Sequence, residues 1–137
     1  MINDTIKEFN IKLNEDPDIK KLQDLKYNNG IIVNISNKSY IDIIKSFSKE
    51  IDYIDIIKED NILTFNNKET NFKIVLNESL LNNVKSKFSY DYLKHSIFKL
   101  TNEVSLSLSN DYPLQLDYKI YNKLNLRFIL APRVNED

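Results

Sequence analysis

The same order of predicted secondary structure occurs twice between residues 30 and 131, and this duplication restricts the fold more than any other feature of the sequence. The first unit begins with a short strand in which alternate residues are apolar. It continues with a helix that has an apolar stripe, and then with three strands. The apolar residues are Ile31, Val33 and Ile35 in the strand and Tyr40, Ile43, Ile44 and Phe47 in the helix, and the three strands are predicted at 51–58, 61–67 and 71–78.

The second unit repeats this order about fifty residues further along the chain. A strand at 83–88 precedes a helix with the apolar stripe Tyr90, Leu93, Ile97 and Leu100, and strands are predicted at 103–109, 113–120 and 124–131. Ser36 or Asn37 is suited to cap the first helix, and Ser89 the second. Both helices need an apolar surface to cover their stripes. The pattern therefore favours a single α+β domain, a duplicated βαβββ unit with two helices packed side by side on one face of antiparallel sheets.

Residues 5–29 stand outside the repeat. Residues 6–13 alternate imperfectly, as a strand does, and the residues up to 29 read as an extended, charged connector that contains Ile19, Leu22 and Leu25. These three apolar residues either pack onto the core or form an exposed docking strip, and their spacing does not decide between the two.

The composition excludes several kinds of protein. Without cysteine, the chain forms neither disulfides nor thiolate metal sites, which suits a reducing compartment or one in which disulfides play no part. The N-terminal sequence does not resemble a signal peptide, and no apolar run is long enough to span a bilayer. The net charge of −1 gives no general attraction for nucleic acid, so contact with DNA requires the basic residues to gather on one face.

Lysines on the predicted helices can form such a face. They are Lys38, Lys45 and Lys49 on the polar side of the first helix and Lys94 and Lys99 on or near that of the second. The acidic residues Asp52, Asp55, Glu59 and Asp60 lie elsewhere, after the first helix. If the helices are neighbours, their lysines form one basic strip that suits sequence-independent contact with phosphates. An ordinary solvated helix surface is the alternative, because such surfaces commonly carry lysine.

The sequence predicts no active site. Gly30 is the only glycine and His95 the only histidine, which excludes a glycine-rich phosphate loop and a histidine metal cluster. A hydrolase that uses His95 with Ser89 or Ser96 is an alternative to a solvated histidine on the polar side of its helix. The acidic residues at 15, 16 and 18 lack the spacing of a calcium loop. We therefore expect a binding protein with no catalytic residues, no metal and no cofactor.

The end of the chain carries a more specific motif. Its parts are Pro113-Leu114, Tyr118-Lys119-Ile120, Leu126, Phe128 and Leu130-Ala131-Pro132-Arg133, followed by an acidic tail. This pattern resembles the C-terminal end of the eukaryotic-type DNA sliding clamp, proliferating cell nuclear antigen. Residues 39–56 and 88–100 resemble the two helical regions of that family's C-terminal domain, and 9–25 resemble the last strand of its N-terminal domain and the interdomain connecting loop. The resemblance divides the chain into residues 1–29, from that N-terminal domain and loop, and residues 30–137, a C-terminal sliding-clamp domain.

The resemblance implies a function without catalysis. Clamp subunits close into a ring around duplex DNA, whatever its sequence, with helices lining the hole and sheets on the outside. The residues expected to face DNA are Lys38, Lys45, Lys49, Lys94 and Lys99. Lys45 falls where relatives carry a basic DNA-facing residue, whereas Asp42 falls where many carry another. The second interpretation is a clamp-fold DNA-binding or transcription accessory protein that does not encircle DNA.

The resemblance also implies a pocket for partner peptides. Replication and repair proteins insert a motif with a glutamine, an aliphatic residue and two aromatic residues on one helical turn, and a clamp loader is a further expected partner. The residues that match the pocket walls are Ile19, Leu22 and Leu25 from the connector, Pro113, and Ile129, Leu130, Ala131 and Pro132 from the tail. We expect a bound peptide to hold the tail in place, because a chain end frays unless something holds it.

Finally, the resemblance implies assembly. Family subunits join head to tail through two edge strands, which correspond here to residues 71–78 and 6–13. The expected interface residues are Phe72, Ile74 and Leu76 on one strand and Ile6, Phe9 and Ile11 on the other. Since unpaired edges invite association, we expect self-assembly or a partner that supplies a separate N-terminal half. The chain is then part of a longer subunit, one half of a split clamp or a one-domain clamp, in the nucleus or a viral replication compartment.

Overall fold

The duplicated order of elements is confirmed in a computed structural model, which describes residues 30–68, 70–77, 82–121 and 124–133. The first unit consists of β1 (Ile31–Ser36), α3 (Asn37–Ser46), β2 (Tyr53–Glu59), β3 (Ile62–Asn67) and β4 (Thr70–Val75). The second consists of β5 (Val84–Ser89), α4 (Tyr90–His95), β6 (Glu103–Leu108), β7 (Leu114–Tyr121) and β8 (Leu124–Leu130). The mixed α+β fold with antiparallel sheets agrees with the fold class that the sequence predicts.

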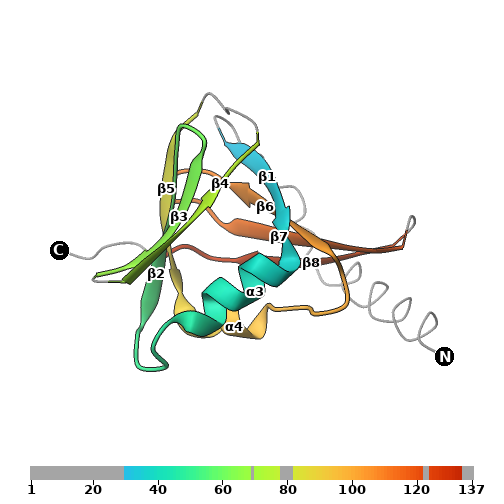
Figure 1. The fold of residues 1–137 in the computed structure, drawn as a ribbon, viewed down its shortest axis with the longest axis horizontal. Coiled ribbons are helices and arrows are strands. Elements are labelled where there is room, and N and C mark those ends of the chain that lie inside the picture. The colour runs from blue at the N-terminus through green and yellow to red at the C-terminus, as the bar shows by residue number, and fades with distance from the viewer. Residues whose placement is uncertain (1–29, 69, 78–81, 122–123, 134–137) are drawn as a thin grey trace.

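The two units exchange their first strands. One antiparallel sheet has the order β1-β6-β7-β8 and the other has the order β4-β3-β2-β5. Each sheet therefore combines three strands of one unit with the opening strand of the other, through pairs such as Val33 with Leu106 and Ile56 with Ser86. In Figure 1, β2–β5 lie on the left, the other sheet lies on the right, and both helices lie at the bottom of the view. Neither unit has a complete sheet without the other.

The core lies between the sheets and the helices, and alternation along the strands builds it. β1 alternates buried and exposed residues throughout, and β2 and β3 bury every second residue. Fully buried side chains come from both units and include Tyr40, Ile44, Ile54, Ile56, Leu63, Phe65, Phe88, Leu93, Leu106 and Tyr118. Burial of each apolar side chain of this size contributes about 1.5–3 kcal/mol, so the packing that joins the units is the main source of stability.

Each helix begins in an equivalent way. Ser36 Oγ accepts a hydrogen bond from Ser39 N (3.3 Å), and Ser89 Oγ accepts one from Tyr92 N (3.5 Å), so both serines act as N-caps. The backbone amide of the first residue in each helix donates a hydrogen bond to a carbonyl of the other βαβββ unit. Asn37 N donates to the carbonyl of residue 102, just before β6 (2.9 Å), and Tyr90 N donates to the carbonyl of residue 52, just before β2 (3.0 Å).

The side chains at these two helix starts also join the helices to each other. Asn37 Nδ2 donates to the carbonyls of Phe98 (2.7 Å) and Thr101 (3.0 Å), beyond the end of α4. Tyr90 Oη donates to the carbonyls of Ile44 (2.7 Å) and Phe47 (3.4 Å), at the end of α3. The Ile44 carbonyl is among the last of α3, which have no partner within the helix, and the carbonyls at 98 and 101 lie in the irregular segment after α4, so each contact gives a partner to carbonyls that no helical amide reaches. The helices consequently lie side by side and antiparallel.

The predicted second helix is too long. The predicted apolar stripe reaches Leu100, but α4 ends at His95 and Leu100 is 85% exposed. Ser96 terminates the helix, because its amide is shared between the carbonyls of Tyr92 and Leu93 and its hydroxyl donates to Leu93 O. Beyond it, the carbonyls at 98 and 101 accept from Asn37 instead of from helical amides. Similarly, Phe47 lies just past the end of α3, although it is buried as predicted.

Tyr90→Phe removes the hydroxyl that joins the helices. Such a hydrogen bond contributes about 1 kcal/mol net and an unsatisfied buried carbonyl costs about 1–3 kcal/mol, so we expect the free energy of unfolding to fall by about 1–2 kcal/mol. Urea denaturation measures the change. Tyr92→Phe is the matched control, because Tyr92 lies on the same helix and is 57% exposed. If the control destabilises the protein as much as Tyr90→Phe, the bridging role is wrong.

Alkaline pH is expected to destabilise the fold through Tyr118. Burial raises the pKa of this phenol from 10.0 to about 12, and its hydroxyl donates to Ser96 O at 2.8 Å. The neutral phenol therefore stabilises the native state fully below pH 10, and this contribution is lost as the pH rises through about 12. Denaturation at stepped pH should show the decline, which Tyr118→Phe should reduce. Tyr121→Phe, at a site that is 60% exposed, should keep the wild-type profile.

Candidate nucleic-acid interface and partner site

Three predicted DNA-facing lysines meet on the helix side of the domain. Lys38 and Lys45 are exposed on α3, and Lys99 is exposed in the turn after α4. Together with Asp42 and residues 101–102, they line a shallow hollow of about 570 Å³ between α3 and the segment that follows α4. The antiparallel helix pair therefore gathers lysines that are up to sixty-one residues apart in the sequence, since 99 − 38 = 61.

The electrostatics of this hollow favour an anion. The neighbouring Lys99 side chain, through close contact and repulsion between the two charges, lowers the pKa of Lys45, and the Asp42 carboxylate only partly opposes this effect. Two ammonium groups held this close raise the local positive potential. A phosphate oxygen placed between them would relieve their repulsion.

The other two predicted DNA-facing lysines are arranged differently. Lys49 is exposed beyond the end of α3 and is not among the residues that line the hollow. Lys94 Nζ lies 3.9 Å from Asp91 Oδ1 and 4.8 Å from the centroid of the Tyr90 ring, so its charge is partly balanced on its own helix. The basic surface is therefore centred on α3 and the turn after α4.

The positions of His95, Ser89 and Ser96 do not support the hydrolase alternative. His95 Nδ1 lies 2.7 Å from Asp91 O on the exposed side of α4, whereas Ser96 is buried and its hydroxyl donates to Leu93 O. Ser89 Oγ is the N-cap of α4. Among the described residues, no three His, Cys, Asp or Glu side chains are grouped to hold a metal ion. No helix in the described ranges has the length and apolar character needed to cross a membrane.

Part of the predicted peptide pocket comes together at the β7–β8 pair. Leu114 pairs with Leu130 and Gln115 pairs with Ile129, so Pro113 and Ala131 lie at the same end of the two strands. Leu130 packs against the core, because it shares a face with the buried Leu114. Ile129 is half-buried on the opposite, outward face of the sheet. The remaining pocket residues, Ile19, Leu22 and Leu25, lie outside the described residues.

The domain itself holds the tail that follows β8. Arg133 N donates to Lys87 O on β5 (2.7 Å), and a guanidinium nitrogen of Arg133 donates to Asp52 O (3.2 Å). The same guanidinium lies 5.9 Å from the centroid of the Tyr53 ring, over which Lys87 Nζ also lies, at 4.1 Å. Sequence reasoning assigned this holding role to a bound peptide and missed the contact, because no local pattern links residue 133 to residues 52 and 87.

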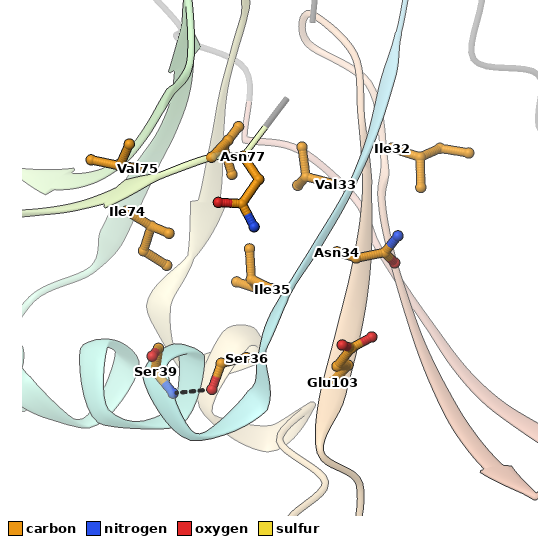
Figure 2. A pocket seen from close by; sticks show the side chains of 11 residues that line it. Ile32, Val33, Asn34, Ile35, Ser36, Ser39, Ile74, Val75, Asn77 and Glu103 are labelled. Carbon is orange, nitrogen blue, oxygen red and sulfur yellow. Dashed lines mark hydrogen bonds between the residues drawn. The ribbon is translucent and has the colours of Figure 1, made fainter. Parts of the chain in front are cut away.

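Two unpaired strand edges face each other on the other side of the domain. Within the described residues, β4 pairs only with β3 and β1 pairs only with β6. A groove of about 460 Å³ lies between them. Figure 2 shows Val33 and Ile35 pointing toward β4, while Ile32 points to the other side of β1. Val75 on β4 is 70% exposed beside the groove.

The residues on and just after β4 that were predicted for the interface contact the core of their own domain. Phe72, Ile74 and Leu76 are half-buried and pack against the core of their own domain, and the Phe72 ring lies 5.1 Å from that of Phe47. The intervening side chains of β4 are exposed, as is its outer edge within the described residues. The matching residues Ile6, Phe9 and Ile11 lie outside the described part of the chain.

Comparison with known proteins agrees with this architecture. A sequence model of the proliferating cell nuclear antigen C-terminal domain matches residues 19–133. The DNA polymerase sliding clamp of Methanococcoides burtonii is 42% identical over 57 residues, which are 39% of this chain and 23% of that protein. The clamp of Methanosarcina mazei is 45% identical over 56 residues, which are 38% of this chain and 22% of that protein.

A solved structure shares the fold. The crystal structure of proliferating cellular nuclear antigen from Entamoeba histolytica matches with a TM-score of 0.70 and 27% identity, over 81% of this chain and 48% of that chain. The match thus spans about half of that clamp and under a quarter of the two archaeal proteins. The family match over residues 19–133 shows that this chain belongs to the proliferating cell nuclear antigen C-terminal domain family.

Proposed function

We propose that this chain forms all or part of a DNA sliding-clamp subunit, which encircles duplex DNA and tethers replication and repair enzymes to it. The observation that carries the proposal is that exposed lysines on α3 and in the turn after α4 share one hollow within a sliding-clamp fold. In this arrangement residues 30–137 act as the C-terminal clamp domain, and residues 1–29 supply the connecting loop and a strand for assembly. The protein is then a scaffold and not an enzyme.

A ring suits the modest charge of this surface. Lys38, Lys45 and Lys99 face DNA together with Asp42, and exposed ion pairs are each worth only about 0–1 kcal/mol. Such contacts are too weak to hold DNA for long, but a closed ring does not need strong contacts. Weak, sequence-independent contacts let the ring slide while its topology keeps it on the duplex.

Assembly would use the free edge of β4. An unpaired edge with an exposed Val75 and an adjacent groove is suited to accept a further strand. Residues 6–13 of a second copy, or a separate N-terminal half, would provide that strand. The partners are duplex DNA, proteins with clamp-interacting motifs and a clamp loader, and the site of action is the nucleus or a viral replication compartment.

Lys45→Ala and Lys99→Ala are expected to weaken duplex binding equally for all sequences. If each lysine contacts one phosphate, each variant lowers the slope of log affinity against log salt concentration by about 1. Fluorescence anisotropy of an arbitrary duplex at several salt concentrations measures this. Lys73→Ala, on the exposed side of β4, is the control and should leave the slope unchanged. A comparable loss in the control would mean that the helices do not form the DNA surface.

Retention on circular DNA tests the proposed function as a whole. Protein assembled on a closed plasmid should co-elute with it in gel filtration at moderate salt and should leave when a restriction enzyme cuts the circle. The reason is topological, because the ring slides off a free end. Equal retention on closed and linear DNA would instead favour an accessory protein that does not encircle DNA.

Leu22→Asp and Pro132→Asp are expected to weaken binding of a labelled clamp-interacting peptide at least tenfold, about 1.4 kcal/mol each, because a carboxylate in an apolar pocket loses hydration. Anisotropy titration measures the affinity. Asn61→Asp introduces the same charge at an exposed position between β2 and β3 and should bind as the wild type does. Unchanged binding by both pocket variants would show that the pocket lies elsewhere.

A further inference from the structure

The side chains of Gln115, Asp117 and Arg127 form a polar ladder on the outer face of β7 and β8, next to the proposed peptide pocket. The strands lie side by side along their length in Figure 1, and the register pairs Gln115 with Ile129 and Asp117 with Arg127. Cross-strand partners share a face, so these four side chains lie on the same face, opposite to the buried Leu114 and Leu116. The apolar part of this face, with Ile129, is at the Pro113 end of the strands. The charged pair Asp117 and Arg127 follows two residues further along each strand.

Arg127 fixes the carboxylate of this ladder, and the carboxylate in turn fixes the amide of Gln115. Arg127 Nε donates to Asp117 Oδ1 at 2.7 Å, and Gln115 Nε2 donates to Asp117 Oδ2 at 2.8 Å. A carboxylate only accepts hydrogen bonds, so the amide must turn its NH₂ group and not its oxygen toward Asp117. The orientation of the Gln115 amide therefore follows from chemistry.

This orientation leaves one unused acceptor beside the apolar wall. Within the described residues, the bond to Asp117 is the only hydrogen bond of the Gln115 side chain. With Nε2 turned to Asp117, Oε1 lies on the other side of the amide, and Gln115 is the cross-strand neighbour of Ile129. Each Asp117 oxygen already accepts one hydrogen bond, whereas Gln115 Oε1 accepts none among the described residues and belongs to the cross-strand neighbour of Ile129.

We propose that Gln115 is a specificity-determining residue of the peptide site: its Oε1 accepts a hydrogen bond from the phenolic hydroxyl of a tyrosine in the partner's aromatic pair. This inference rests on the proposed peptide-binding function. Ile129 and Pro113 provide the apolar contact that any aromatic ring would make. Gln115 adds a contact that only a ring with a donor at its tip makes, and Asp117 and Arg127 are positioning residues that keep the acceptor turned outward.

The test uses two labelled peptides with the glutamine, aliphatic and double-aromatic motif, identical except that one has tyrosine and the other phenylalanine at both aromatic positions. Against the full chain, the tyrosine peptide should bind about three- to tenfold more tightly, the range of one net hydrogen bond. In Gln115→Leu this ratio should fall to about one. Asp117→Ala should also reduce the ratio, because it removes the carboxylate that fixes the orientation of the Gln115 amide.

Ile129→Ala is the matched control, since it removes apolar contact from both peptides and should weaken both while keeping their ratio. Equal affinities for the two peptides in the wild type, or a preference that survives in Gln115→Leu, would overturn the role of Gln115 and leave the peptide site intact. Failure of both peptides to bind would overturn the peptide site itself, and the proposal for Gln115 with it.

Discussion

The fold depends on a reciprocal contact in which the first residue of each helix binds backbone carbonyls at or beyond the end of the other. Asn37 binds the carbonyls at 98 and 101, and Tyr90 binds those at 44 and 47. The backbone amides of the same two residues donate to the segments that lead into β6 and β2. These groups lie at helix ends or in the irregular segments beside them, where a chain otherwise leaves polar atoms unpaired. The contact therefore fixes the helices and the strand exchange together.

The distribution of the surfaces follows from this contact. Once the helices are antiparallel neighbours, Lys38, Lys45 and Lys99 share one hollow. The sheets occupy the other sides, so the free edges of β4 and β1 face a groove on one flank. On the opposite flank, Arg133 connects the end of β8 to β5. The surfaces proposed for DNA, for assembly and for peptides thus occupy different parts of a small domain, so that each can be used without blocking the others.

Local patterns predicted the elements well, and the contacts between distant residues less well. Alternating apolar residues identified the strands, and the serines at 36 and 89 identified the helix starts, because both signals act within a few residues. Periodicity extended α4 to Leu100, because the spacing is suitable and nothing local shows that Asn37 captures the carbonyls at 98 and 101. Similarly, Lys58 occupies a fully buried inward position of β2 and donates to Asn82 O at 2.6 Å, which its charge would not suggest.

The site was predictable to the extent that it depends on the end of the chain. The motif around Leu130-Ala131-Pro132 identified the family and hence the proposed peptide pocket at β7–β8, but not the inward direction of Leu130 or the hydrogen bond between Arg133 and β5. Those depend on register and on the second sheet. The polar ladder from Arg127 to Gln115 was missed for the same reason, since it forms only when two strands pair in one register.

The central claim is that the helix side of this domain, and not its sheets, meets DNA. Because the chain has no cysteine, a single cysteine can be introduced at Asp42 on α3 or at Lys73 on β4, and the assembled protein can be cross-linked to a duplex with thiol-reactive groups on its backbone. Cross-linking through position 42 but not through position 73 is the predicted result. Cross-linking through position 73 with none through position 42 would contradict the account.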